Sequence, residues 1–400
     1  MFSKKTVKLL PSWFFGFTSL LIGVTLFVTW LDNSFDFKVM KQIIGITFTS
    51  VAYYTFLSYN NFNLKKIFKW YISIAVIVSL YGIFEEFLHL GGIHISKDIR
   101  RTTFGLYRVY SVMGEPYFLA VVLIPAFFYL LSNFTSMRKF GNLSREFTNM
   151  LIVGVCFVLT FSTAGLIGFA LVIIFWLYNR KYFSVTNWKI IFLPLVILLL
   201  TVIFTNVKDG WQEFNTKYTE TLNAFTVKKL SKKEASSLNS SSFAIFSNYM
   251  IAKASFSDNP ITGTGLGTHE KNYLDKFGNF FDEDFLKRYG AFNANDANSL
   301  FLRLMSETGL LGLSLFFIFL FKNFLWQRGY DNKELRAYTL INQGIFIWFV
   351  VRLVRTGNYF GNGFFLFFFI YYFSCKIVKM KLREQKVRLE NQRTTMILAH

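Results

Sequence analysis

The sequence contains little charge, little proline and almost no cysteine. Only 16% of its residues are charged, whereas soluble domains carry about a quarter. The two cysteines, Cys156 and Cys375, lie far apart in apolar segments, which argues against a disulfide framework. Five prolines in 400 residues suit helices that face lipid. These shortages exclude an ordinary soluble domain and a secreted domain that is held together by disulfides.

Apolar and aromatic residues are abundant instead. Hydrophobic residues make up 53% of the chain, aromatic residues 20%, and 52 residues are phenylalanine. Apolar runs recur at about 17–25 residues, the length of a helix that crosses a bilayer. The first run is expected to be a retained anchor, because no small-residue cleavage site follows it. The predicted fold is an all-α polytopic membrane protein with about ten spans. The expected spans are 12–30, 40–59, 70–90, 116–131, 149–161, 164–178, 188–207, 300–321, 338–354 and 359–375.

The apolar stretch 149–178 is too long for one ordinary helix. The sequence FSTAG stands in its middle, and Ser, Thr and Gly favour turns over helix interiors. We therefore predict two short helices with a turn near Ser162 and Thr163. The positive-inside rule supports this division, because only with it do six basic groups fall on the cytoplasmic side. These groups are Lys4, Lys5 and Lys8; Lys65, Lys66 and Lys69; Arg138, Lys139 and Arg145; Arg180, Lys181 and Lys189; Lys322, Arg328, Lys333 and Arg336; and the tail from Lys376 to Arg393.

This arrangement places both termini in the cytoplasm. Residues 1–207 are expected to form seven transmembrane helices, and residues 208–298 one large external loop. Residues 299–375 would form three more helices, and residues 376–400 a basic tail at the cytoplasmic lipid surface. Within the loop, the stretch SFAIFSNYMIAKASF has helical apolar spacing and is expected to lie on the membrane surface.

The same loop contains TGTGLGTHEKNY, with glycines at positions 263, 265 and 267. Glycines allow close backbone approach and offer amides to an anion. The stretch lacks the GK[ST] ending of a Walker A loop. A plain turn is the alternative to a ligand contact at Gly263, Gly265 and Gly267.

A helix is predicted to follow, in DANSLFLRLMSETGLLGLSLFFIF, with Asp296 or Asn298 as its N-cap. Arg303 and Glu307 stand four residues apart, so a local ion pair is the structural alternative to a functional site.

The combination of NPITGTGLG with DANSLFLRLMSETGLLGL resembles the O-antigen ligase and polymerase superfamily of bacterial envelope glycan assembly. Asp296, Ala297, Leu302, Glu307, Gly309 and Gly312 match the spacing of that family's loop-helix motif. RVYSVMGEPYFLA resembles the family's segment before a span, RTGNYFGNGFF resembles a stretch of its Wzy-type polymerases, and LTFSTAG resembles its TxSRG turn. Asn298 stands where ligases carry a histidine, and Thr163 replaces the arginine of the turn. These departures favour a polymerase.

The resemblance implies a GT-C-like architecture and an inverting, metal-independent glycosyl transfer. The donor would be a glycan on polyprenyl diphosphate, and the acceptor a hydroxyl of the next lipid-linked repeat unit. No cofactor, metal or nucleic acid is expected. The membrane, a flippase and a chain-length regulator are the expected partners. Ligation of finished glycan to a lipid core is the closest alternative, and a polytopic transporter or flippase is the alternative of another class.

Arginines are the expected ligands of the leaving diphosphate, because a guanidinium binds phosphate oxygens in pairs. Arg355 is the first candidate, with snorkelling to the interface as its structural alternative. Arg352, Arg108 and Arg303 follow, and an ion pair with Glu115 is the alternative for Arg108. Asn298 and the three glycines complete the expected binding set.

Three residues are candidates for the base that takes the acceptor proton. His269 titrates near neutrality, although a loop histidine is ordinarily inert. Glu115 precedes Pro116 at a membrane boundary, where burial would favour its protonated form; starting a helix is its structural alternative. Asp296 has plain N-capping as its alternative. Glu85, Glu86, His89 and His94 lie close together in the sequence, but their spacing fits no zinc motif.

Overall fold

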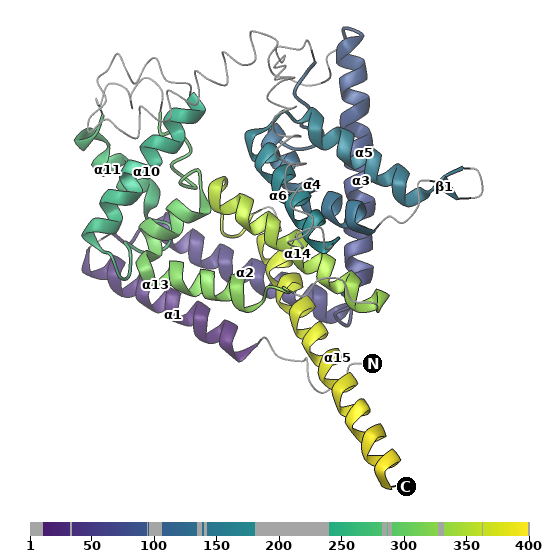
Figure 1. Cartoon of the computed structure of the whole chain (residues 1–400). Coiled ribbons are helices and arrows are strands. Elements are labelled where there is room, and N and C mark those ends of the chain that lie inside the picture. Colours follow the sequence, from purple (N-terminus) through teal and green to yellow (C-terminus); the bar gives the residue numbers. More distant parts are fainter. Residues whose placement is uncertain are drawn as a thin grey trace, which may run out of the picture. The chain divides into compact units, whose positions relative to one another are not determined.

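The computed structural model describes residues 11–32, 34–93, 95, 106–133, 138–139, 142–180, 240–281, 286, 290–326, 332–361 and 363–398. The chain divides into two compact units (Figure 1). The first unit comprises Met1–Ser58, Leu195–Phe319 and Phe349–Phe365. The second comprises Tyr59–Pro194, Leu320–Trp348 and Leu366–His400. Each unit is described by itself below.

The described chain is almost entirely helical. Strands β1 (Arg138–Lys139) and β2 (Asn142–Leu143) form one short antiparallel pair in which Arg138 faces Leu143. The helices are α1 (Ser12–Leu31), α2 (Phe37–Tyr59), α3 (Leu64–Leu90), α4 (Pro116–Asn133), α5 (Arg145–Leu159), α6 (Thr163–Asn179), α10 (Ser240–Asp258), α11 (His269–Lys276), the 3-10 turn η2 (Phe277–Asn279), α13 (Leu300–Lys322), α14 (Lys333–Val354) and α15 (Phe364–Leu398).

The protein is a helical membrane protein. Among the described helices, five are long and apolar enough to cross a bilayer: α1, α3, α4, α13 and α14. Large apolar side chains such as Phe27, Phe48 and Ile77 are more than 60% exposed on α1, α2 and α3, as lipid-facing surfaces require. Within the described residues, helices occupy nine of the ten positions predicted from the sequence, and the expected span 188–207 lies outside them. The count of ten spans stays a prediction.

The predicted division of residues 149–178 is confirmed. Helix α5 ends at Leu159 and α6 begins at Thr163, and Phe161 between them has a positive φ of 43°. Both helices pack on α4 within the second unit. The ring of Phe127 on α4 stacks on Phe157 at 5.7 Å between centroids. The turn therefore lets two short helices share one packing partner.

Helix α10 lies beside α11 in the first unit (Figure 1). The helix was predicted, but its expected place on the membrane surface is wrong. Phe243, Phe246 and Ile251 are buried among aromatic residues of α11 and the following turn, chiefly Tyr273 and Phe277. The apolar face of α10 is thus covered by protein and is not available to lipid.

The N-cap of α13 also differs from the prediction. The hydroxyl of Ser299 accepts the amide of Leu302 at 3.2 Å, so Ser299 caps the helix. Asp296 instead accepts the amide of Asn298 at 3.0 Å, within the turn that precedes the helix. Asn298 has a positive φ of 57° and lies two residues before Leu300.

Helix α15 continues from the last expected span through the basic tail without a break at residue 375. Glu334 of α14 accepts Lys65 at 3.2 Å and Lys381 at 2.5 Å. This bridge joins α3, α14 and α15 within the second unit.

Candidate functional site

The glycine-rich stretch docks onto a break in α13. The helix is interrupted at Gly309, whose φ and ψ are 57° and −154°. The amides of Leu310 and Leu311 donate to the carbonyls of Pro260 and Ile261 at 2.8 and 3.0 Å. In return, the carbonyls of Ser306 and Glu307 accept the amides of Thr264 and Gly265 at 3.0 and 2.9 Å. The loop therefore replaces the helical hydrogen bonds that the break removes.

Each of the three glycines permits a close contact. A Cβ on Gly263 would lie 2.4 Å from the Glu307 carbonyl carbon, and one on Gly265 would lie 2.7 Å from Thr29 Cγ2. A Cβ on Gly267 would lie 3.0 Å from the Lys38 carbonyl. All three glycines also have positive φ. The geometry gives the motif a packing role, and a contact of Gly263, Gly265 or Gly267 with ligand stays a prediction.

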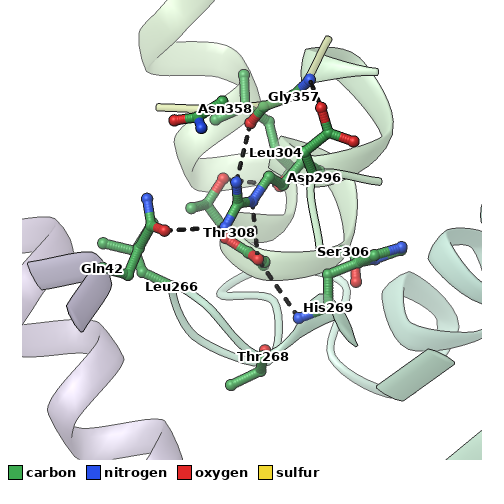
Figure 2. Close-up of polar contacts among 12 residues, drawn as sticks. Gln42, Leu266, Thr268, His269, Asp296, Leu304, Ser306, Thr308, Gly357 and Asn358 are labelled. Carbon is green, nitrogen blue, oxygen red and sulfur yellow. Dashed lines mark hydrogen bonds and ion pairs between the residues drawn. The ribbon is translucent and has the colours of Figure 1, made fainter. Parts of the chain in front are cut away.

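Arg303 joins three segments of the first unit through its guanidinium. Its Nε donates to Glu307 Oε1 at 3.0 Å, its Nη1 to the Gly357 carbonyl at 3.1 Å, and its Nη2 to Gln42 Oε1 at 3.0 Å. The guanidinium also lies 4.5 Å from the ring centre of Tyr359. Figure 2 shows Gln42, Gly357 and His269 converging from different elements on one set of polar contacts. The predicted local ion pair is confirmed, and it is part of a wider network.

His269 belongs to the same network. Its amide donates to Glu307 Oε1 at 3.3 Å, and its Nε2 lies 3.0 Å from Asn248 Oδ1. The Asn248 amide nitrogen already donates to the carbonyls of Ala244 and Phe292, so its oxygen faces the imidazole, and Nε2 carries the proton. Complete burial, followed by the positive charge of Arg303, lowers the pKa of His269 to about 3. The ring is therefore neutral near pH 7.

Asp296 and Asn298 contact the turn that follows α14. Asp296 Oδ2 accepts the amide of Gly357 at 3.3 Å, and the Asn298 carbonyl accepts the amide of Thr356 at 3.0 Å. Asp296 is half-buried and Asn298 is buried. The loop-helix motif and the stretch that begins at Arg355 are therefore neighbours in space, although more than fifty residues separate them.

Several buried polar atoms around this network lack a hydrogen-bond partner. They include Gln42 Nε2, Ser255 Oγ, His269 Nδ1, Asn298 Nδ2, Ser306 Oγ and Thr356 Oγ1. Because proteins satisfy nearly all buried polar groups, such a cluster indicates a place for water or a polar ligand.

Arg352 and Arg355 lie at the C-terminal end of α14. Arg352 is fully buried; its Nη2 donates to the Asn358 carbonyl at 2.5 Å, and its guanidinium lies 5.4 Å from the ring centre of Phe364. Arg355 follows the last helical residue and is partly exposed. The sequence predicted both as binding residues, and the structure brings them into the first unit with Asp296, Asn298, Arg303 and His269.

The comparison with protein families found a match to part of the chain. Residues 148–317 match the family model described as O-antigen ligase. This segment is similar to the O-antigen ligase family, and the match supports a relationship to the O-antigen ligase and polymerase superfamily. The matched segment contains the glycine loop, His269, Asp296 and the Arg303–Glu307 pair, so the resemblance inferred from these motifs is confirmed. A search of curated proteins found no match. The match supports a glycosyltransferase-like activity.

Two residues predicted for the site lie in the second unit, outside the segment that matches the O-antigen ligase family. Arg108 is half-buried, whereas Glu115 is exposed. The expectation that Glu115 is buried is therefore wrong. Its main-chain carbonyl accepts the amide of Phe118, so the residue contributes to the start of α4, which was its structural alternative. Both residues stay predictions as parts of the ligase-family site.

The neighbouring glutamates of α3 have structural roles in the second unit. Glu85 accepts the amide of Ser111 at 3.1 Å, and Glu86 accepts the amide of Tyr107 at 2.9 Å. They hold the segment around Arg108 against the helix. His94 lies outside the described residues. Within the part of the chain that the structure describes, no three His, Cys, Asp or Glu side chains cluster as metal ligands.

Sequence reasoning assigned no site role to three residues that contact Arg303, namely Gln42, Gly357 and Tyr359. Gln42 is buried in α2, but it follows Lys41 directly, so no isolated polar residue marked it in the sequence. Gly357 and Tyr359 stand in the stretch RTGNYFGNGFF, which the sequence analysis noted for its resemblance to Wzy-type polymerases but in which it assigned a role only to Arg355. Their contacts with Arg303 depend on tertiary structure and leave no local pattern.

Proposed function

We propose that the chain polymerises oligosaccharide repeat units, linked to polyprenyl diphosphate, into a surface polysaccharide. The observation that carries this proposal is the turn at Arg355. Arg355 is partly exposed. The next residue, Thr356, and Asn298, whose carbonyl accepts the Thr356 amide, each carry a buried polar atom with no hydrogen-bond partner among the described residues, Oγ1 and Nδ2 respectively. A hydroxyl and an amide nitrogen both donate hydrogen bonds, which suits the oxygens of a phosphate group.

The proposed reaction is one displacement with inversion. The oxygen of the acceptor hydroxyl attacks the anomeric carbon of the donor glycan. The bond from that carbon to the phosphate oxygen breaks, and polyprenyl diphosphate leaves with the electron pair. Arg355 and Arg352 stabilise the charge that develops on the leaving group. Arg303 contributes less, because Glu307 already neutralises its charge at 3.0 Å.

The acceptor proton passes to a carboxylate or to water in this scheme. His269 is the least suitable of the three predicted bases, since a pKa of about 3 is far from the near-neutral value that favours a general base. Asp296 and Glu115 stay as candidates. The oxygens of Asp296 already accept the amides of Asn298 and Gly357, although each carboxylate oxygen can accept a further bond.

Ligation of a finished glycan to a lipid core is the second candidate function. The matching family model is described as an O-antigen ligase, which favours this alternative. Asn298, in the place of the ligase histidine, favours the polymerase. The transporter alternative gains no supporting observation from the described residues.

We further propose that the protein lies in the bacterial inner membrane with both termini in the cytoplasm and with the site facing outward. There it would receive substrate from a flippase and act with a chain-length regulator. Reporter fusions at Arg145 and Lys233 should then lie on opposite sides of the membrane. Fusions that report the same side would overturn this topology.

The glycan ladder of a deletion strain tests the function. Complementation with the unchanged gene should restore long chains, whereas the Arg355→Ala variant should leave single repeat units on the acceptor. The Arg383→Ala variant, altered in the exposed tail, should restore long chains and serves as the control. Complete loss of attached glycan, with long chains on the carrier lipid, would show a ligase instead. An unchanged ladder in the deletion strain would refute both functions for that glycan.

A further inference from the structure

The segment Asp296–Arg303 holds the last turn of α14 and the turn after it at four points. The Ser299 hydroxyl donates to the carbonyl of Leu353 at 2.6 Å. The amides of Thr356 and Gly357 donate to the Asn298 carbonyl and to Asp296 Oδ2 at 3.0 and 3.3 Å. Arg303 Nη1 donates to the Gly357 carbonyl at 3.1 Å. Arg355 therefore lies in the middle of a stretch that is fixed on both of its sides.

The backbone of this turn is strained. Thr356 has a φ of 82°, which is a genuine outlier for a β-branched residue. Ala297 and Asn298, on the other side of the contact, have φ of 54° and 57°. A Cβ on Gly357 would lie 1.8 Å from the Asp296 carbonyl oxygen, so no other residue fits there. Strain of this kind persists only where the surrounding contacts enforce it.

The contacts that enforce the strain are themselves fixed. Arg303 cannot turn away from Gly357 without breaking its bonds to Glu307 and Gln42, and both partners are buried. Asp296 is similarly held, because its second oxygen accepts the amide of Asn298. Each hydrogen bond to the turn is therefore supported by a second bond, which is how a protein sets the direction of a residue that binds a ligand.

We propose that Asp296 and Arg303 are positioning residues that aim Arg355, by fixing the peptide of Gly357 at its nitrogen and at its oxygen. This inference rests on the proposed function only in assigning Arg355 to the diphosphate. Asp296 and Arg303 belong to the loop-helix motif within the matched segment 148–317. In this proposal they hold in place a turn, at residues 355–357, that lies outside that segment. Asp296 then acts through Arg355 and not on the acceptor proton.

A labelling experiment tests the positioning without any glycan assay. Arg355→Cys is introduced into a chain with Cys156 and Cys375 replaced by serine, and its reaction rate with a water-soluble maleimide is measured in membranes. Adding Asp296→Asn, which has the same shape but cannot accept both amides, should change that rate by about threefold or more, because one of two paired bonds is lost. A cysteine at the exposed Gly290 is the control and should react equally in both backgrounds. An unchanged rate at position 355, in a variant that unfolds at the normal temperature, would overturn the proposal.

A double-mutant cycle with purified protein and lipid-linked repeat units separates positioning from proton transfer. If Asp296 acts through Arg355, Asp296→Asn should raise the KM for the donor by about tenfold, since a misplaced binding group is costly, and should add no further loss in the Arg355→Ala background. Independent losses, or a fall in kcat with a changed pH profile, would make Asp296 a base and overturn the proposal.

Should Asp296→Asn unfold, Arg303→Lys replaces it in both experiments, because it keeps the positive charge beside Glu307 but cannot make all three guanidinium bonds, among them the one to the Gly357 carbonyl. A changed labelling rate in a protein without glycan activity would uphold the positioning and refute the proposed function alone.

Discussion

Arg303 and Glu307 stand one helical turn apart on α13 and form an ion pair, 3.0 Å from Nε to Oε1, in which both side chains are almost fully buried. Arg303 also donates hydrogen bonds to Gln42 and Gly357, and Glu307 also accepts the amide of His269. Removal of one member of the pair would leave the charge of the other uncompensated in the protein interior, which is costly because water does not reach it.

Glu307→Ala should therefore lower the free energy of unfolding by about 3–5 kcal/mol, the usual cost of breaking a buried pair. Thermal unfolding of the detergent-purified protein measures the change. Glu390→Ala is the matched control, because Glu390 forms an exposed pair of the same spacing with Lys386 at 3.8 Å and should matter little. Equal effects of the two substitutions would show that the Arg303–Glu307 pair is not buried in the folded protein.

A methyl group at Gly263 should disrupt the docking of the glycine loop on α13. The added carbon would meet the Glu307 carbonyl carbon and the Thr308 nitrogen at 2.4 Å, and backbone atoms cannot move aside. Gly263→Ala should thus give little folded protein on size-exclusion chromatography. Gly290→Ala provides the comparison, since Gly290 also has positive φ but has open space around its Cα. A monodisperse, active Gly263→Ala protein would contradict the packing role.

Acid should destabilise the protein through His269. Its pKa is about 3 in the folded chain and about 6.5 in an unfolded chain, so the unfolded state binds the extra proton between these values. The stabilising contribution of the neutral ring is complete above pH 6.5 and is lost as the pH falls toward 3, by about 1.4 kcal/mol per pH unit. Unfolding temperatures of the wild type and of His269→Gln, measured from pH 7.5 to 4.5, test this. The wild type should lose more; parallel curves would mean that His269 is accessible to protons.

Glycan transfer should continue in EDTA. The proposed site supplies its positive charge through Arg355 and Arg352, so a divalent ion has no necessary role in releasing the diphosphate. Polymer formation by the purified protein, with and without EDTA, gives the measurement, and added Mg²⁺ serves as the control for nonspecific effects. Loss of activity that Mg²⁺ restores would exclude the proposed chemistry.

The fold was readable from the sequence where one local pattern decides the outcome. Apolar runs placed α1–α4 and α13–α15, and the residues Ser162 and Thr163 placed the turn between α5 and α6. The pattern could not decide what covers an apolar face. The spacing of Phe243, Phe246 and Ile251 fits lipid and protein equally, and the aromatic residues that cover them belong to a polar-looking segment after His269.

The site was readable in part. The sequence pointed to Arg303, Asp296 and Arg355 separately, since charged residues in an apolar chain are conspicuous. It did not show that Arg303 and Asp296 meet at Gly357, because that meeting depends on a turn with positive φ at Thr356. The burial of His269 was equally hidden, for a histidine after three glycines reads as an exposed loop residue.

The bonds between Asp296–Arg303 and the turn after α14 set an order for biogenesis. Asp296, Asn298 and Arg303 leave the ribosome more than fifty residues before Thr356 and Gly357, the residues to which they form hydrogen bonds. During that interval α13 is already complete, while Thr356 and Gly357 do not yet exist. The site can therefore form only after α14 has been synthesised, and a chain that is truncated before residue 355 would insert its earlier helices without acquiring it.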